Sequence, residues 1–315
     1  RIPVTDRLLQ DAWDGFILEK EILKKIGPAI RSGKSCFLYG PPGTGKTTLA
    51  KKVAEYFIRC GGSVAVPHAL LVGGSVIRVY DPVYHQRATD STNEADNAQW
   101  LNPAQEDARW VVCRRPAVVC GGELTLDMLD LRYNPTTRYY EAPFQLKANG
   151  GVLIIDDFGR QLVTPRDLLN RWIVPLEEGV DYMTLHTGKK FCIPFEQFVV
   201  FSTNLDPMKL ADEAFLRRIR YKVYIAEPSI DTFKEIFRRE SKRKGVQYNE
   251  ADLDTVIQKH YVDRQRPFRA CDPRDITDFI VDYCSFQDVP LDISRSLLDL
   301  IFGEYHAGIQ MDETG

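Results

Sequence analysis

The sequence has no long apolar run: a membrane-spanning helix needs about 18 consecutive apolar residues, and no segment approaches that length. No signal-peptide pattern opens the sequence as given, so we expect a cytoplasmic protein without a membrane span. The seven cysteines are an odd number with no CxxC pair, which argues against a disulfide framework and against a zinc site. No internal repeat is visible, which leaves an ordinary globular protein as the expectation.

Net charge is also small. The 41 lysines and arginines nearly balance the 44 aspartates and glutamates, for a formal net charge of −3, so the whole chain gives no electrostatic argument for nucleic-acid binding. Basic residues gather only locally, at 217–222, 238–244 and 264–269. The densest of these, 238–244, is a candidate nucleic-acid contact, although such faces are usually just solvated.

Short apolar segments alternate with segments of helical periodicity through the first two thirds of the chain, which favours a mostly parallel α/β sheet. Helical spacing before residue 34 predicts a lead-in that Gly27-Pro28 interrupts. After residue 227 the strand signals largely stop. We therefore expect an α/β domain over 1–227 and a smaller helical lid over 228–315. All-apolar segments predict buried strands at 35–39, 152–155 and 197–202.

Three further patterns place smaller elements. The β-rich and polar segments at about 61–120 predict an insertion, with 90–107 at its surface. Residues 124–131 predict a helix, and a hairpin is expected at about 181–195. Thr164-Pro165-Arg166-Asp167 predicts a helix start, because threonine caps, proline fits the first turn and aspartate takes the capping-box position.

A glycine-rich motif carries the first chemistry. Residues 40–47 match G-x-x-x-x-G-K-[ST], after an apolar strand and before a helix. Such a loop turns backbone N–H groups towards phosphate oxygens, its lysine places a charge on the β- and γ-phosphates, and its threonine hydroxyl can ligate Mg²⁺. The expected nucleotide-binding residues are Gly40, Pro41, Pro42, Gly43, Thr44, Gly45, Lys46, Thr47 and Thr48.

A phosphate-binding loop needs a carboxylate at the end of a neighbouring strand to hold its metal. The strand at 152–155 ends in Asp156 and Asp157. We expect Asp156 to organise Mg²⁺ together with Thr47, and Asp157 to orient or deprotonate the attacking water. The plainer alternative is a pair of acidic turn residues.

With these two motifs the sequence resembles the AAA+ ATPases. Residues 147–151, the helical segment 168–178, the hairpin and the strand 198–204 follow the order of the MoxR and magnesium-chelatase-type ATPases, in the branch with a hairpin before the first sensor. The resemblance implies a P-loop NTPase fold with a helical lid, ATP and Mg²⁺ as ligands, and a ring, expected to be a hexamer.

The resemblance also assigns roles to polar residues. Asn204 would be the sensor that contacts the γ-phosphate or water; its alternative is a turn asparagine. Arg217 or Arg218 would be the arginine finger that reaches a neighbouring subunit's ATP, with Arg220 a third candidate, or they form a solvated basic helix end. Arg274 would be the second sensor, or an ordinary surface arginine.

The sequence departs from this family at one catalytic position, because many relatives have glutamate where Asp157 stands. The leading hypothesis is an ATPase that remodels a macromolecular partner, with protein favoured and the hairpin tip at His186, Lys189 and Lys190 as the contact. The alternatives are a DNA-associated ATPase switch and a slowly hydrolysing nucleotide-binding module. The same branch includes the bacterial enhancer-binding activators. Residues 124–131 lack the loop motif by which those activators engage polymerase, so the sequence does not support that activity.

Overall fold

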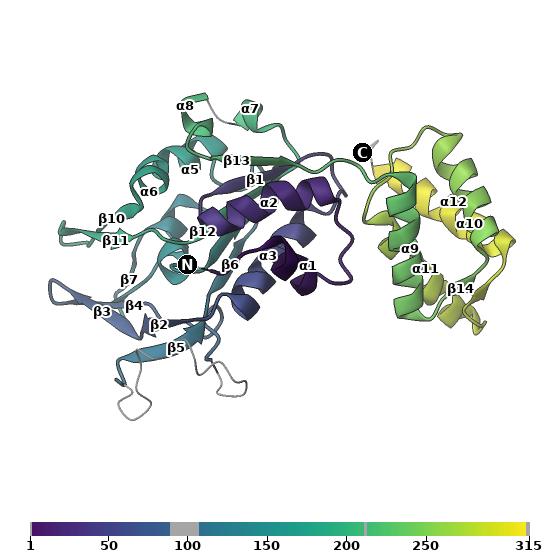
Figure 1. Cartoon of the computed structure of the whole chain (residues 1–315). Helices are drawn as coiled ribbons and strands as arrows, with labels where there is room; N and C mark the ends of the chain where they lie inside the picture. Colours follow the sequence, from purple (N-terminus) through teal and green to yellow (C-terminus); the bar gives the residue numbers. More distant parts are fainter. Residues whose placement is uncertain (1, 89–106, 211–212, 313–315) are drawn as a thin grey trace. The chain divides into compact units, whose positions relative to one another are not determined.

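The computed structural model describes residues 2–88, 107–210 and 213–312 (Figure 1). The expected surface insertion at 90–107 lies, apart from Asp107, outside the described residues. The chain forms two compact units. The first comprises residues 1–40 and 46–224, and the second comprises residues 41–45 and 225–315.

A five-stranded parallel sheet forms the centre of the first unit. Its strands lie in the order β13 (Tyr221–Tyr224), β1 (Cys36–Tyr39), β12 (Phe198–Thr203), β9 (Val152–Ile155) and β6 (Ala117–Cys120). Every residue of β9 and β12 is buried, as expected for strands covered on both faces. The parallel α/β sheet is thus confirmed. However, β6 belongs to this sheet, so the insertion ends before residue 117.

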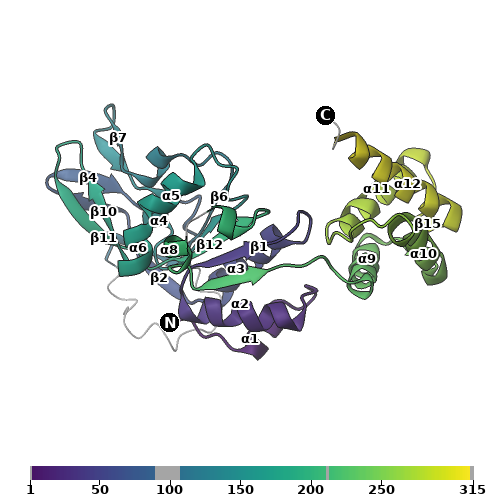
Figure 2. The ribbon, with the colours of Figure 1, turned by 90° about the horizontal axis from the view of Figure 1, so that it is seen from above.

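Helices cover both faces of this sheet (Figure 2). On one face lie α1 (Asp6–Ala12), α2 (Lys20–Ser32) and α3 (Lys46–Cys60), and Phe57 of α3 stacks on Phe198 with ring centroids 5.7 Å apart. On the other face lie α5 (Pro165–Arg171) and α6 (Ile173–Glu178), which bring Trp172 against Phe201.

Two expectations about helices were wrong. Gly27-Pro28 does not interrupt the lead-in, because both residues lie inside α2, which ends only at Gly33 in a left-handed conformation. The buried neighbours Ile26, Ala29 and Ile30 hold this helix on the sheet and outweigh the hydrogen bond that proline removes. The helix expected at 124–131 is a single 3₁₀ turn, Leu126–Leu129.

The cap at Thr164 is confirmed. Its hydroxyl oxygen accepts a hydrogen bond from the backbone N–H of Asp167 at 3.2 Å, and Pro165 occupies the first turn of α5. The helix expected at 168–178 is divided into α5 and α6 at Trp172.

The inserted segments form a small β module beside the central sheet. Strands β2 (Ser63–Pro67) and β5 (Trp110–Arg114) pair antiparallel. A four-stranded sheet has the order β3 (Ala69–Val72), β4 (Ser75–Arg78), β8 (Tyr139–Glu141) and β7 (Arg132–Asn134). The short helix α4 (Phe144–Lys147) leads from this sheet back to β9.

The predicted hairpin is present as β10 (Val180–Thr184) and β11 (Lys190–Pro194). It does not stand free, because Met183, Leu185 and Ile193 are buried in one hydrophobic cluster with Ile77 and Tyr140 of the inserted sheet. Two short helices, α7 (Pro207–Leu210) and α8 (Glu213–Leu216), separate β12 from β13.

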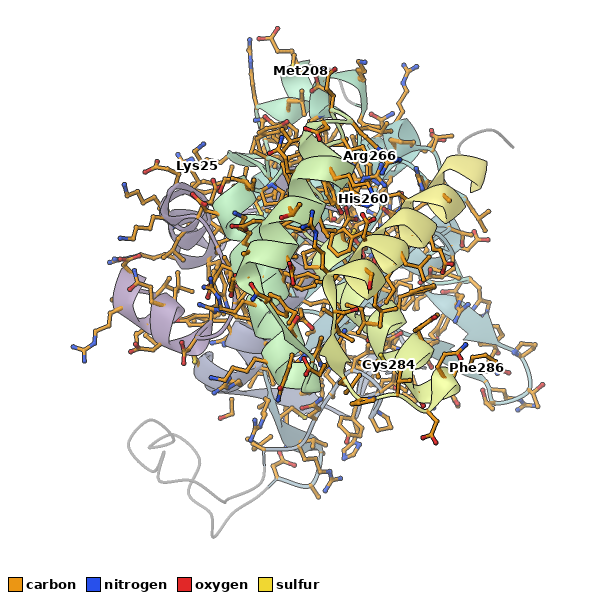
Figure 3. All side chains as sticks on the ribbon, turned by 90° about the vertical axis from the view of Figure 1, so that its right-hand side faces the viewer. Lys25, Met208, His260, Arg266, Cys284 and Phe286 are labelled. Atoms are coloured by element: carbon orange, nitrogen blue, oxygen red, sulfur yellow. The ribbon has the colours of Figure 1, made fainter. Side chains whose placement is uncertain are left out.

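The second unit is mainly helical. It contains α9 (Ile230–Lys244), α10 (Glu250–Ile257), a π-helical turn at Gln258–Val262, α11 (Asp272–Gln287) and α12 (Arg295–Asp312), with the two-residue strands β14 (Gln247–Tyr248) and β15 (Asp292–Ile293). Its core includes Phe233, Phe237 and Phe302. Figure 3 shows His260 beside Arg266, whose guanidinium donates to the His260 carbonyl at 3.2 Å. Among the described residues, no helix is long and apolar enough to cross a membrane.

Phe201 tests the core of the first unit. It is fully buried between Phe37, Phe158 and Trp172, so Phe201→Ala is expected to lower the free energy of unfolding of this unit by ~3–5 kcal/mol. All four tryptophans precede residue 225, so urea denaturation followed by tryptophan fluorescence reports on this unit alone. Tyr182→Ala, at a side chain 57% exposed, is the control and should change stability by less than ~0.5 kcal/mol. Coincident transitions for Phe201→Ala and the parent would contradict this packing.

Candidate nucleotide-binding site

Three adjacent parallel strands bring the predicted polar residues to one edge of the central sheet. Gly40 follows β1, Asp156 follows β9 and Asn204 follows β12. The strands end at nearly the same level, because Tyr39 pairs with Thr203 and Phe201 pairs with Ile155. Ligand sites of open parallel sheets lie at this carboxyl edge, so the register places these residues where a nucleotide would bind.

Lys46 begins α3 directly above this edge and is only 5% exposed. Its ammonium donates to the carbonyl of Gly40 at 3.0 Å. Burial lowers the pKa of Lys46, and the carboxylates of Asp157 and Asp156 act in the opposite direction. The lysine therefore lies within electrostatic reach of both aspartates, at the N-terminus of a 15-residue helix.

Thr47 and Asp156 are brought into direct contact although 109 positions separate them. The Thr47 hydroxyl donates to a carboxylate oxygen of Asp156 at 2.9 Å. Two oxygens held together in this way suit Mg²⁺, which takes one or two protein oxygens and completes its shell with phosphate and water. No cluster of three or more histidine, cysteine or acidic side chains able to hold a metal occurs among the described residues.

Asp157 adopts a left-handed backbone conformation, with φ of 50°, and is exposed. Aspartate tolerates this region better than most residues. The turn is fixed from both sides: the backbone N–H of Phe158 donates to the Ser202 carbonyl at 2.7 Å, and the Thr203 hydroxyl donates to the Phe158 carbonyl at 2.6 Å. Strand β12 thus holds the turn that presents Asp157.

Sequence reasoning missed Gln161. Its side-chain amide donates to the Asp156 carbonyl at 2.7 Å, and its side-chain oxygen accepts the N–H of Gly159 at 2.8 Å. Gln161 therefore braces the turn that contains Asp157. A single glutamine in a polar loop carries no pattern, so only the folded geometry reveals it.

The loop between β1 and α3 belongs to the second unit over residues 41–45. Gly43 and Gly45 have φ of 76° and 92°, values that side chains rarely adopt. The Thr44 hydroxyl donates to the Pro41 carbonyl at 3.0 Å. The motif's glycines thus serve the backbone turn for which the sequence predicted them.

The candidate finger arginines lie at the end of α8 and in the segment that leads to β13. Arg217 is exposed and pairs with Glu213 at 2.7 Å, one helical turn away. Arg218 is partly buried and pairs with Glu177 of α6 at 3.0 Å. Arg220 is exposed just before β13. All three stay predictions as fingers.

The candidate second sensor, Arg274, lies in the first turn of α11 in the second unit. Its guanidinium pairs with the adjacent Asp275 at 2.9 Å, and its carbonyl accepts a hydrogen bond from Lys244. Two residues earlier in the same helix, Asp272 is 2% exposed and accepts hydrogen bonds from the hydroxyls of Tyr261 and Tyr305. The sensor role of Arg274 stays a prediction.

The central sheet and the joined motifs define the class: an AAA+ P-loop NTPase fold with a parallel-sheet core and C-terminal helices. Residues 36–84 match the family described as ATPase family associated with various cellular activities (AAA). This match spans β1, the phosphate loop with Lys46 and Thr47, α3 and strands β2 to β4. Residues 229–300, in the helical unit, match a domain of unknown function, DUF8689.

Curated relatives are similar over short regions. Replication-associated recombination protein A of Coxiella burnetii is 33% identical over 113 residues, which cover 34% of this chain and 25% of that protein. The proteasome-activating nucleotidase of Methanocella arvoryzae is 44% identical over 66 residues, which cover 20% of this chain and 15% of that protein. The chain therefore spans a quarter or less of the length of these relatives.

Solved structures are similar over nearly the whole chain. RuvB of Thermotoga maritima, a Holliday junction branch migration motor, has a TM-score of 0.51 at 16% identity and covers 94% of this chain and 72% of its own. NtrX of Brucella abortus in complex with ADP has a TM-score of 0.54 at 12% identity, and the match covers 95% of this chain and 58% of the NtrX chain. At these identities the likeness establishes the fold alone.

Lys46→Ala tests the phosphate cradle. We expect ATP affinity to fall about 30-fold or more, because a charged hydrogen bond to phosphate contributes ~2 kcal/mol or more. Equilibrium dialysis with labelled ATP and Mg²⁺ measures this. Lys52→Ala, at a partly exposed lysine of α3 paired with Glu55, is the matched control and should bind ATP as the parent does. Equal affinities for the two variants would remove Lys46 from the site.

Proposed function

We propose that this protein is an Mg²⁺-dependent ATPase that assembles into a ring and couples ATP hydrolysis to remodelling of a macromolecular partner. One observation carries the proposal: the Thr47 hydroxyl meets the Asp156 carboxylate at 2.9 Å, so the start of α3 and the acidic end of β9 would form a single metal-nucleotide site. In it Lys46 would hold the β- and γ-phosphates, Thr47 and Asp156 would hold the metal, and Asp157 would take the proton of the attacking water.

Assembly is proposed from the arginines. Arg217 and Arg220 are exposed on the first unit, and a positive side chain of this kind serves hydrolysis when it stabilises the charge that develops on a neighbouring subunit's ATP. We propose a ring, and a hexamer as its size, on the resemblance to the AAA+ ATPases. ATP would promote this assembly, because each site would lie between two subunits.

Within the AAA+ ATPases we propose the branch with a hairpin before the first sensor, similar to MoxR and magnesium chelatase. The order of elements supports it: α6, the hairpin β10–β11, and then the sensor strand β12 that ends before Asn204. The docking of the hairpin on the inserted sheet gives this chain its own form of that arrangement.

Two classes of partner follow from the relatives. The proteasome-activating nucleotidase is named for activating a protein machine, and RuvB is titled as a motor on Holliday junctions. The proposed function therefore takes the partner as a macromolecule.

Asp157→Asn tests the chemical step. Asparagine keeps the size and tolerates the left-handed backbone, but it cannot accept the proton, so phosphate release should fall about 10²-fold or more while ATP affinity is unchanged. Asp157→Glu is the companion variant. Slow parental turnover that rises in Asp157→Glu would favour the slowly hydrolysing module, whereas full turnover in Asp157→Asn would remove Asp157 from the mechanism.

The double variant Arg217→Ala with Arg218→Ala tests the ring. It should bind ATP normally but lose about 10³-fold in turnover, because a finger contributes only to the transition state. Phosphate release measured across a dilution series gives the turnover rate, and sedimentation velocity on the same samples gives the oligomeric state. A variant that hydrolysed ATP at the parental rate as a dilute monomer would rule out the ring mechanism.

A further inference from the structure

Three turns of the first unit meet at one end of the inserted sheet. They are the β3–β4 turn at Gly73-Gly74, the β7–β8 turn at 135–138 and the tip of the β10–β11 hairpin at 185–189. Strand β8 runs parallel to β4 and antiparallel to β7, so the first two turns lie at the same end of the sheet. Figures 1 and 2 show the β3–β4 and β10–β11 ends projecting together.

Direct contacts hold the hairpin tip in this group. The backbone N–H of His186 donates to the Tyr140 hydroxyl at 2.9 Å, and the His186 ring stacks on Tyr133 with centroids 4.6 Å apart. On the other side, the Lys189 side chain lies over Gly73, where an added Cβ would come within 2.7 Å of the lysine Cδ. The three turns therefore form one continuous surface, which we call the three-turn surface.

The three-turn surface is positive although the chain is acidic overall. Residues 69–80, 131–140 and 182–195 contain no aspartate or glutamate, and their lysines and arginines are Arg78, Arg132, Arg138, Lys189 and Lys190. Arg78 pairs with Glu141 at 2.9 Å. Within the described part of the chain, Arg132, Arg138, Lys189 and Lys190 form no ion pair, and all four are exposed.

An exposed aromatic ring accompanies these cations. Tyr133 is 40% exposed on the edge strand β7, and its ring is held in place by His186 on one side and by Tyr140 at 5.0 Å. A fixed ring beside unpaired cations is the combination by which proteins bind single strands, because phosphates meet the charges and unpaired bases stack on the ring.

We infer that the three-turn surface binds single-stranded nucleic acid. Arg138, Lys189 and Lys190 would contact successive phosphates, and a base would stack on Tyr133. The charge favours an anionic partner, and the exposed ring favours unpaired bases over an acidic peptide or a duplex, whose bases are already stacked. The inference stands apart from the proposed ATPase activity, because the contacts lie on the inserted sheet and hairpin and need no nucleotide.

The test uses the full chain and a fluorescein-labelled dT oligonucleotide, with anisotropy followed over a series of salt concentrations, first without ATP. Arg138→Ala, Lys189→Ala and Lys190→Ala together should weaken binding at least about tenfold and reduce the slope of log K against log salt by about 2, since each phosphate contact on a single strand contributes about 0.7. Tyr133→Ala should weaken binding about tenfold, whereas Tyr133→Phe should bind as the parent does.

A matched control removes three other positive charges. Arg7→Ala, Lys24→Ala and Lys52→Ala together alter α1, α2 and α3, where each cation already pairs with a carboxylate, and oligonucleotide binding should not change. ATP affinity measured on every variant separates this result from failure of the nucleotide site. Absence of oligonucleotide binding by the parent, equal loss in both triple variants, equal affinity for a duplex, or displacement by a polyglutamate peptide at equal charge would each overturn the inference.

Discussion

The alignment of three strand ends is the constraint on which the site depends. Strands β1, β12 and β9 are neighbours, and their register leaves Gly40, Asn204 and Asp156 at one edge. Only then can the hydroxyl of Thr47, on the helix after β1, reach the carboxylate of Asp156. Because a one-residue slip of a strand turns its side chains to the opposite face, a slip of β9 would turn Asp156 away from Thr47, so the register fixes the chemistry as well as the fold.

The parts predicted from the sequence are those in which a local pattern dictates the structure. Glycines and lysine in fixed positions specify the phosphate loop, and runs such as 152–155 can only be strands covered on both sides. Thr164 and Pro165 specify a helix start, because the threonine cap and the proline in the first turn act only on residues next to them in the sequence. The sequence also predicted that Thr47 and Asp156 lie together, because the phosphate loop and the acidic strand end must meet to hold one metal ion and its nucleotide.

The parts that could not be predicted depend on contacts between distant segments. Pro28 reads as a helix breaker, and only the buried face of α2 overrides it. Strands β7 and β8 are three residues each and gain their form from β4. Gln161 acquires its role from the turn after β9. The docking of the hairpin on the inserted module through Met183, Leu185 and Ile193 is likewise a contact between distant segments.

Lys147 gives this arrangement a mechanical consequence. Its ammonium is almost fully buried and pairs with Asp81 at 2.7 Å and with Glu141 of β8 at 2.5 Å, while Lys147 itself ends α4, five residues before β9. Burial alone would raise the pKa of Glu141, but the hydrogen bonds from Lys147 and Arg78 outweigh it and lower that pKa, so the group stays charged. A buried ammonium cannot release both carboxylates without a large desolvation penalty. A displacement of the inserted sheet would therefore strain the segment between α4 and β9, the strand that precedes Asp156.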